Sequence, residues 1–109
     1  MKKIKRLKRK DFKEVLEKGK TIKTNYLIFK YLKQNLPYFR LGILISKKVS
    51  KKATERNKIK RRIREIVRLN LPEISDKLDM VFIVLPQIKN EFSFLKEEIL
   101  RIFEKIKNV

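Results

Sequence analysis

One stretch of this sequence constrains the fold most, because it is basic almost throughout and yet carries apolar residues at helical spacing. Four branched residues fall at i, i+4, i+7 and i+8, on one face of a helix: Ile59, Ile63, Ile66 and Val67. The pattern predicts a helix from about Ala53 to Leu69, which Pro72 prevents from continuing. We expect the stripe to face a hydrophobic core.

The opposite side of this helix is predicted to be strongly cationic. A row at i, i+4, i+7 and i+11 consists of Asn57, Arg61, Arg64 and Arg68. Arg56 and Lys60 flank the core-facing stripe. Like charges one turn apart destabilise an isolated helix, whereas arginine forks suit phosphate groups. The pattern therefore favours an anionic partner over an ordinary solvated helix face.

The net charge of the whole chain also favours an anionic partner. The sequence has 31 Lys and Arg against 12 Asp and Glu, a formal net charge of +19. Such self-repulsion destabilises a compact domain, and a polyanion relieves it by neutralising the field and releasing counterions. Since 42% of the residues are hydrophobic, a packed core is still expected. We predict one RNA-binding domain over residues 1–109, with residues 1–8 as a basic, flexible N-terminus.

The composition also excludes several classes of site. The chain has no Cys and no His, so disulfides, thiolate metal sites and the commonest general base are absent. We predict no catalytic residue and no metal ligand in the protein. No apolar run is long enough to span a membrane, and the basic N-terminus lacks the apolar run of a signal peptide. The expected location is cytoplasmic.

A short helix is predicted near the N-terminus. Phe12, Val15 and Leu16 fall at i, i+3 and i+4 on one helical face, and Gly19 is typical of a helix end. Asp11, with a glutamate three residues later, resembles a capping box, which predicts that the helix begins there.

The remaining segments predict a small sheet and a last helix. Residues 26–32 and 39–46 are rich in aromatic and branched residues and indicate two antiparallel strands, with residues 21–23 as a short edge strand. The apolar run 79–86 indicates a central strand. A final helix carries the stripe Leu95, Ile99, Ile102 and Ile106. The predicted fold class is α+β: a single-domain two-layer sandwich in the order αβ(β)βαβα, with a small mixed sheet packed by helices.

Particular residues then indicate a family. The run GILISKKV at 42–49, Ala53, and the run RNKIKRRIRE at 56–65 strongly resemble the signature of the bacterial ribonuclease P protein subunit. The early Asp11, Phe12 and Val15 and the later strand opening with Asp79 also resemble that family. Five positions depart from the usual pattern: Leu16, Ser50, Thr54, Lys58 and Leu85. At Lys58 the charge is kept, but the bidentate fork of arginine is lost.

The resemblance implies a function for the chain. In that family a catalytic RNA carries the active site and holds Mg²⁺, and the holoenzyme removes the 5′ leader of precursor tRNA to give the mature 5′ end. We expect a protein monomer in a 1:1 complex with that RNA. The implied RNA-binding residues are Arg56, Asn57, Lys58, Lys60, Arg61, Arg64, Arg68, Lys47, Lys48, Lys51 and Lys52. The four lysines before the helix have a solvated turn as their alternative.

The resemblance also implies a cleft for the single-stranded leader between the first helix and the sheet. Aromatic side chains suit that role because every base has a face to stack on. The residues assigned to the cleft are Phe12, Leu16, Tyr26 and Lys30. For Phe12 the alternative is simple core packing beside Val15 and Leu16.

Three other functions explain the sequence less completely. A ribosomal protein or general RNA chaperone would explain the charge but not the ordered signature. A protein-only nuclease needs clustered carboxylates for metal ions, whereas the acidic residues here are scattered. A DNA-binding regulator would be expected to carry a short helix-turn-helix and to dimerise.

Overall fold

The strand β5, Lys77–Val84, lies at the centre of a five-stranded sheet. A computed structural model describes residues 4–72 and 77–107. Every residue from Leu78 to Phe82 is buried, as expected of a strand that is covered on both faces. The central strand predicted from the apolar run is therefore confirmed.

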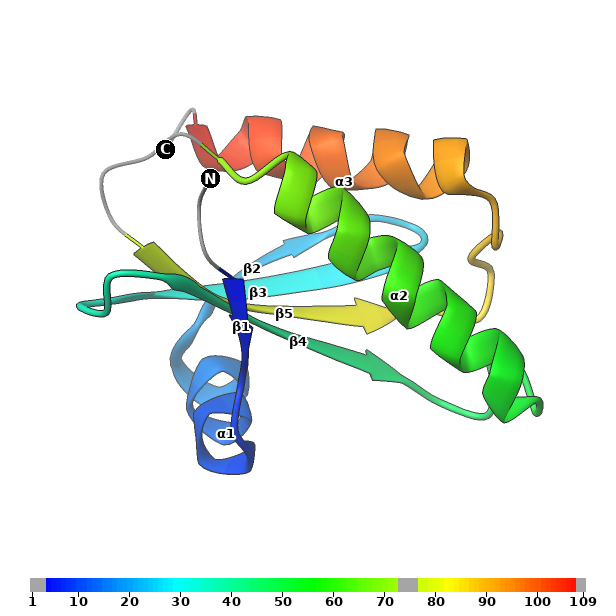
Figure 1. Ribbon diagram of the computed structural model, residues 1–109, viewed down its shortest axis with the longest axis horizontal. Coiled ribbons are helices and arrows are strands. Elements are labelled where there is room, and N and C mark those ends of the chain that lie inside the picture. Colours follow the sequence, from blue (N-terminus) through cyan, green and yellow to red (C-terminus); the bar gives the residue numbers. More distant parts are fainter. Residues whose placement is uncertain (1–3, 73–76, 108–109) are drawn as a thin grey trace.

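The sheet is mixed, with the strand order β1-β4-β5-β3-β2. Its other strands are β1 (Ile4–Arg6), β2 (Lys20–Lys23), β3 (Leu27–Gln34) and β4 (Phe39–Ile45). β5 pairs parallel to β4 and antiparallel to β3, while β1 pairs parallel to β4. The two strands predicted to be antiparallel, β3 and β4, do run in opposite directions. They are not neighbours, however, because β5 lies between them (Figure 1).

Helices lie on both faces of this sheet (Figure 1). α2 (Ala53–Leu69) and α3 (Phe92–Lys107) cover one face, and α1 (Arg9–Lys18) packs alone on the other. The α+β class, the mixed sheet and the bounds of α2 are as predicted. The predicted two layers describe the sheet with α2 and α3, and α1 adds a helix on the far side. The larger core lies between the sheet and α2 and α3, and the smaller core beneath α1 contains Leu7, Val15 and Val81.

Two predictions at the N-terminus are wrong. Residues 4–6 form the edge strand β1 rather than part of a flexible segment, so a strand precedes the predicted element order. The strand was missed because its residues do not alternate in polarity, and because its pairing with β4 involves only backbone groups. Asp11 does not begin α1, because the helix starts two residues earlier, at Arg9, and Asp11 lies buried in its first turn. The predicted helix end at Gly19 is confirmed.

Candidate nucleic-acid interface

The apolar stripe of α2 is fully inside the protein. Ile59, Ile63, Ile66 and Val67 are each at most 1% exposed and belong to the larger core. Burial of the stripe turns the opposite side outward, and Asn57, Arg61 and Arg68 are exposed there as predicted. Arg56 and Lys60 are half-buried on the flanks of the helix, as predicted. The prediction for Arg64 is wrong, because this residue is half-buried on the flank rather than exposed in the outward row. The helix therefore presents a mostly cationic surface, with each residue position fixed by the packing beneath it.

Serine side chains shape the basic loop that leads into α2. The Ser50 hydroxyl oxygen accepts from Lys52 N at 3.2 Å, and the Ser46 hydroxyl oxygen accepts from Lys48 N at 3.2 Å. Arg56 Nη1 donates to the Ser50 carbonyl at 2.8 Å, so the start of the helix and the loop are joined. The four lysines predicted to bind RNA in this loop are all exposed: Lys47, Lys48, Lys51 and Lys52.

One exposed acidic residue, Glu65, partly offsets the positive charge of the outward face of α2. Glu65 Oε1 accepts from Arg68 Nη2 at 2.7 Å, one helical turn away. The hydrogen bond from Arg68 lowers the pKa of Glu65, and the same bond raises the pKa of Arg68. Arg68 therefore already has an anionic partner, whereas Arg61, seven residues nearer the loop, has no ion pair among the described residues.

A structural role for Arg62 was missed in the sequence. Its Nη1 donates to the Asn90 carbonyl at 2.7 Å and to Asn90 Oδ1 at 2.6 Å. Asn90 lies in the segment between β5 and α3, so this contact ties α2 to that segment. The sequence did offer one signal for this role: helical spacing places Arg62 beside the apolar stripe, on the side opposite Lys60, rather than in the outward row.

The second surface lies on the other face of the sheet, beside α1. Phe12 and Leu16 project from α1 and pack, half-buried, on the smaller core. The ring of Phe12 lies over Gly42 of β4. Lys30 Nζ donates to the Leu16 carbonyl at 3.2 Å, which satisfies a free carbonyl in the last turn of α1. Three of the four predicted cleft residues thus lie together.

Tyr26 is not part of this surface. Its ring meets Phe94 of α3 edge to face at 4.8 Å between centroids, and it packs against the larger core. The prediction failed because Tyr26 precedes β3, so the alternation of that strand does not govern its direction.

Beyond α1 the same face of the sheet is partly open. The register places Leu44, Ile83 and Ile28 side by side across β4, β5 and β3. Leu44 is 37% exposed, and the other two are half-buried. Together with Phe12 and Leu16 they form a partly exposed apolar area on the face opposite α2. We call it the α1 shelf.

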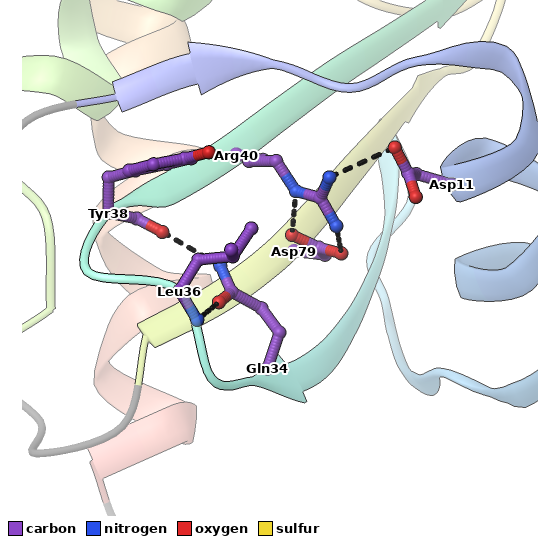
Figure 2. A network of polar contacts seen from close by, with 6 residues as sticks. All are labelled: Asp11, Gln34, Leu36, Tyr38, Arg40 and Asp79. Atoms are coloured by element: carbon purple, nitrogen blue, oxygen red, sulfur yellow. Dashed lines mark hydrogen bonds and ion pairs between the residues drawn. The ribbon is translucent and has the colours of Figure 1, made fainter.

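A buried ion network fixes α1 to the sheet (Figure 2). Arg40 on β4 donates from Nε and Nη2 to the two carboxylate oxygens of Asp79 on β5, at 2.7 and 2.6 Å. Its Nη1 donates to Asp11 Oδ2 on α1 at 3.0 Å. The hydrogen bonds to Asp79 raise the pKa of the Arg40 guanidinium against the opposing effect of burial. The signal in the sequence was a charged residue inside each of two mostly apolar strands, Arg40 in β4 and Asp79 in β5.

The described ranges, 4–72 and 77–107, contain neither a metal-binding cluster nor a membrane-spanning helix. Within them, no three Asp, Glu, Cys or His side chains gather as a metal site would require. None of the helices there has the length and apolar character to cross a membrane.

The fold and the outward surface of α2 define a class of protein. This is a small α+β domain whose long helix turns a mostly cationic face outward, a surface typical of nucleic-acid-binding proteins. A family model described as Ribonuclease P matches residues 1–107. The chain therefore belongs to the ribonuclease P protein family, whose members are protein components of an endoribonuclease of tRNA processing.

Individual relatives support this assignment. The "Ribonuclease P protein component" of Dictyoglomus turgidum is 40% identical over 103 residues, covering 90% of this chain and 84% of that protein. The solved ribonuclease P protein of Thermotoga maritima has a TM-score of 0.78 at 32% identity, over 93% of this chain and 96% of the other. That of Staphylococcus aureus has a TM-score of 0.82 at 26% identity, over 96% and 97%. Sequence and fold thus agree over nearly the whole chain.

Proposed function

We propose that this chain binds the catalytic RNA of ribonuclease P and the 5′ leader of precursor tRNA, and thereby assists removal of the leader. The observation that carries the proposal is the outward face of α2, where Asn57 and Arg61 stand exposed above a fully buried apolar stripe. A projecting basic ridge suits the backbone of a folded RNA. The exposed lysines of the preceding loop extend this ridge.

The leader is assigned to the α1 shelf. Single-stranded nucleic acid is held by apolar and aromatic faces on which bases stack, next to cations that meet the phosphates. Phe12 supplies a half-exposed ring, and Leu44 and Ile83 supply apolar area beside it. Lys30 lies at the edge, with one ammonium hydrogen used on α1 and two left for other acceptors. Tyr26 is excluded because it packs against α3.

The two surfaces lie on opposite faces of the sheet (Figure 1). A protein that binds two RNA segments at once needs separate surfaces, since an apolar shelf and a basic ridge make different contacts. The basic loop joins them, because it begins where β4 ends beyond Leu44 and finishes at the start of α2. One protein molecule per catalytic RNA is sufficient for this arrangement, as a 1:1 complex.

The active site is assigned to the RNA partner. Hydrolysis of a phosphodiester with Mg²⁺ needs several oxygen ligands close together, and no such group of acidic side chains occurs within residues 4–72 and 77–107. The two aspartates that do approach each other, Asp11 and Asp79, are both engaged by Arg40. These residues do not fit a magnesium site, so the metal is assigned mainly to the RNA.

The test is reconstitution with the cognate catalytic RNA. At low magnesium concentration the purified protein should stimulate cleavage of precursor tRNA at the mature 5′ end, and the protein freed of RNA should cleave nothing. An unrelated basic RNA-binding protein at the same concentration is the control for general chaperoning. Equal stimulation by that control would favour a general RNA chaperone, and cleavage by the RNA-free protein would place the active site in the protein.

A further inference from the structure

Arg64 carries an unmet hydrogen-bond donor. Within the described part of the chain, its Nε is the only side-chain nitrogen or oxygen that is buried without a hydrogen-bond partner. An unpaired buried donor costs free energy, and it usually has a ligand, an ion or a water in the functional state. The guanidinium lies on the flank of α2 rather than on its outward row.

A second arginine, on the edge strand β1, lies on the same side of the sheet as this group. Arg6 on β1 pairs in register with Leu41 of β4, which is buried beneath the α2 side of the sheet. Arg6 therefore points to the same side as α2. Burial lowers the pKa of Arg64, and the positive charge of Arg6 lowers it further. The two cations, one on β1 and one on α2, thus repel each other.

No acid balances this pair in the parts of the chain that the structure describes. The ion pairs found there engage Arg40, Arg68 and Arg101, and none engages Arg6, Lys60 or Arg64. Lys60, one helical turn before Arg64, is half-buried on the same flank and adds a third positive charge. A water molecule would satisfy the Nε donor but would leave the repulsion in place, whereas an anion relieves both.

We propose that Arg6 and Arg64 together hold one backbone phosphate of the RNA partner, so that β1 is part of the docking surface. Phosphate oxygens accept from guanidinium forks with good geometry. The proposal rests on the function proposed above and adds to it. The RNA surface then continues from α2 over the flank at Arg64 to the edge strand of the sheet.

The chain offers a matched control next to Arg6. Lys5 is also an exposed cation on β1, but its register partner is Arg40, so it points to the opposite face of the sheet. Its Nζ lies 4.4 Å from the centre of the Tyr38 ring. A general loss of positive charge affects both positions equally, whereas a phosphate site on the α2 side involves Arg6 alone.

The main experiment measures binding of the catalytic RNA by Arg6→Ala and Lys5→Ala over a range of salt concentrations, after circular dichroism confirms folding. Arg6→Ala should weaken binding about tenfold and make the slope of log K against log salt shallower by about one unit, as expected for one lost phosphate contact. Lys5→Ala should leave the slope unchanged. The double variant Arg6→Ala with Arg64→Ala should lose less than the sum of the single losses.

Equal affinities and slopes for Arg6→Ala and Lys5→Ala would overturn the proposal, and so would additive losses in the double variant. If the wild-type protein shows no preference for the cognate catalytic RNA, the proposed function itself fails. A titration with inorganic phosphate, followed through the Arg64 Nε–H signal in NMR spectra, distinguishes the two failures. The signal should shift in the wild type and in Lys5→Ala, and should shift much less in Arg6→Ala. The same shift in all three proteins would overturn the phosphate site.

Discussion

The ring of Phe12 rests on the backbone of Gly42, so closely that a Cβ atom at Gly42 would overlap the ring. The approach of α1 to the sheet depends on this missing side chain, because any other residue would push the helix away. Phe12 is therefore neither a fully buried core residue nor a fully exposed aromatic residue. Its inner side packs on β4, and the residue remains half-exposed at the edge of the α1 shelf.

Gly42→Ala should consequently destabilise the protein by about 1–3 kcal/mol through overpacking, as measured by urea unfolding. The added methyl group would have to displace the Phe12 ring or the whole of α1. Combining it with Phe12→Ala removes the obstacle, so the double variant should lose less stability than the two single losses added together. Additive losses would show that the ring and the glycine do not constrain each other.

Phe12→Ala tests the shelf as a leader site. We expect the variant holoenzyme to lose about 1–3 kcal/mol of affinity for precursor tRNA, the value of one stacked base, and to bind mature tRNA as before. The comparison is made by binding titrations with both tRNAs, once circular dichroism has shown the variant to be folded. Equal loss for both tRNAs would mean that Phe12 acts only in packing.

The ion network of Arg40 should matter for stability (Figure 2). Arg40→Met leaves the carboxylates of Asp79 and Asp11, whose side chains are only 6% and 12% exposed, without their cation. The expected cost is about 3–5 kcal/mol in the free energy of unfolding. Arg40→Lys keeps the charge but not the fork and should cost less. A change below about 0.5 kcal/mol for Arg40→Met would contradict this account.

Charge reversal on α2 should weaken binding of the catalytic RNA without unfolding the helix. In Arg61→Glu with Arg64→Glu, neither residue belongs to the buried apolar stripe, so that stripe is kept, although Arg61 is exposed and Arg64 is half-buried on the flank. Loss of these phosphate contacts should reduce the slope of log K against log salt by about one to two units. Lys96→Glu, at an exposed position on α3, is the control. Filter-binding affinities equal to the wild type would remove α2 from the RNA interface.

Local periodicity was enough to predict the helices and the central strand. The stripe of α2 repeats at the helical spacing, and Pro72 and the apolar run of β5 mark boundaries that depend only on nearby residues. The edge strand β1 could not be found in this way, since its pairing with β4 joins backbone groups far apart in the sequence. Which strands are neighbours is likewise a property of the whole fold. β3 and β4 are consecutive along the chain, but they are not neighbours in the sheet because β5 lies between them.

The same distinction applies to the candidate sites. Helical spacing alone predicts that Asn57 and Arg61 face outward, and the structure agrees. For Tyr26 the direction depends on a turn that precedes β3, so the prediction was wrong. The partnership of Arg40 with Asp11 and Asp79 joins residues 29 and 39 positions apart, which a local pattern does not reveal.

The central place of β5 also governs how the chain can fold. β3 and β4 are made first and can pair with their outer neighbours β2 and β1. Each lacks its inner neighbour, however, until β5, more than thirty residues after the end of β4, is inserted between them. Closing contacts of such high sequence separation is slow. During synthesis, the first half of the chain therefore has unpaired strand edges and strongly basic segments while it is still on the ribosome, itself a large polyanion. Complete folding begins only once the last strand has emerged.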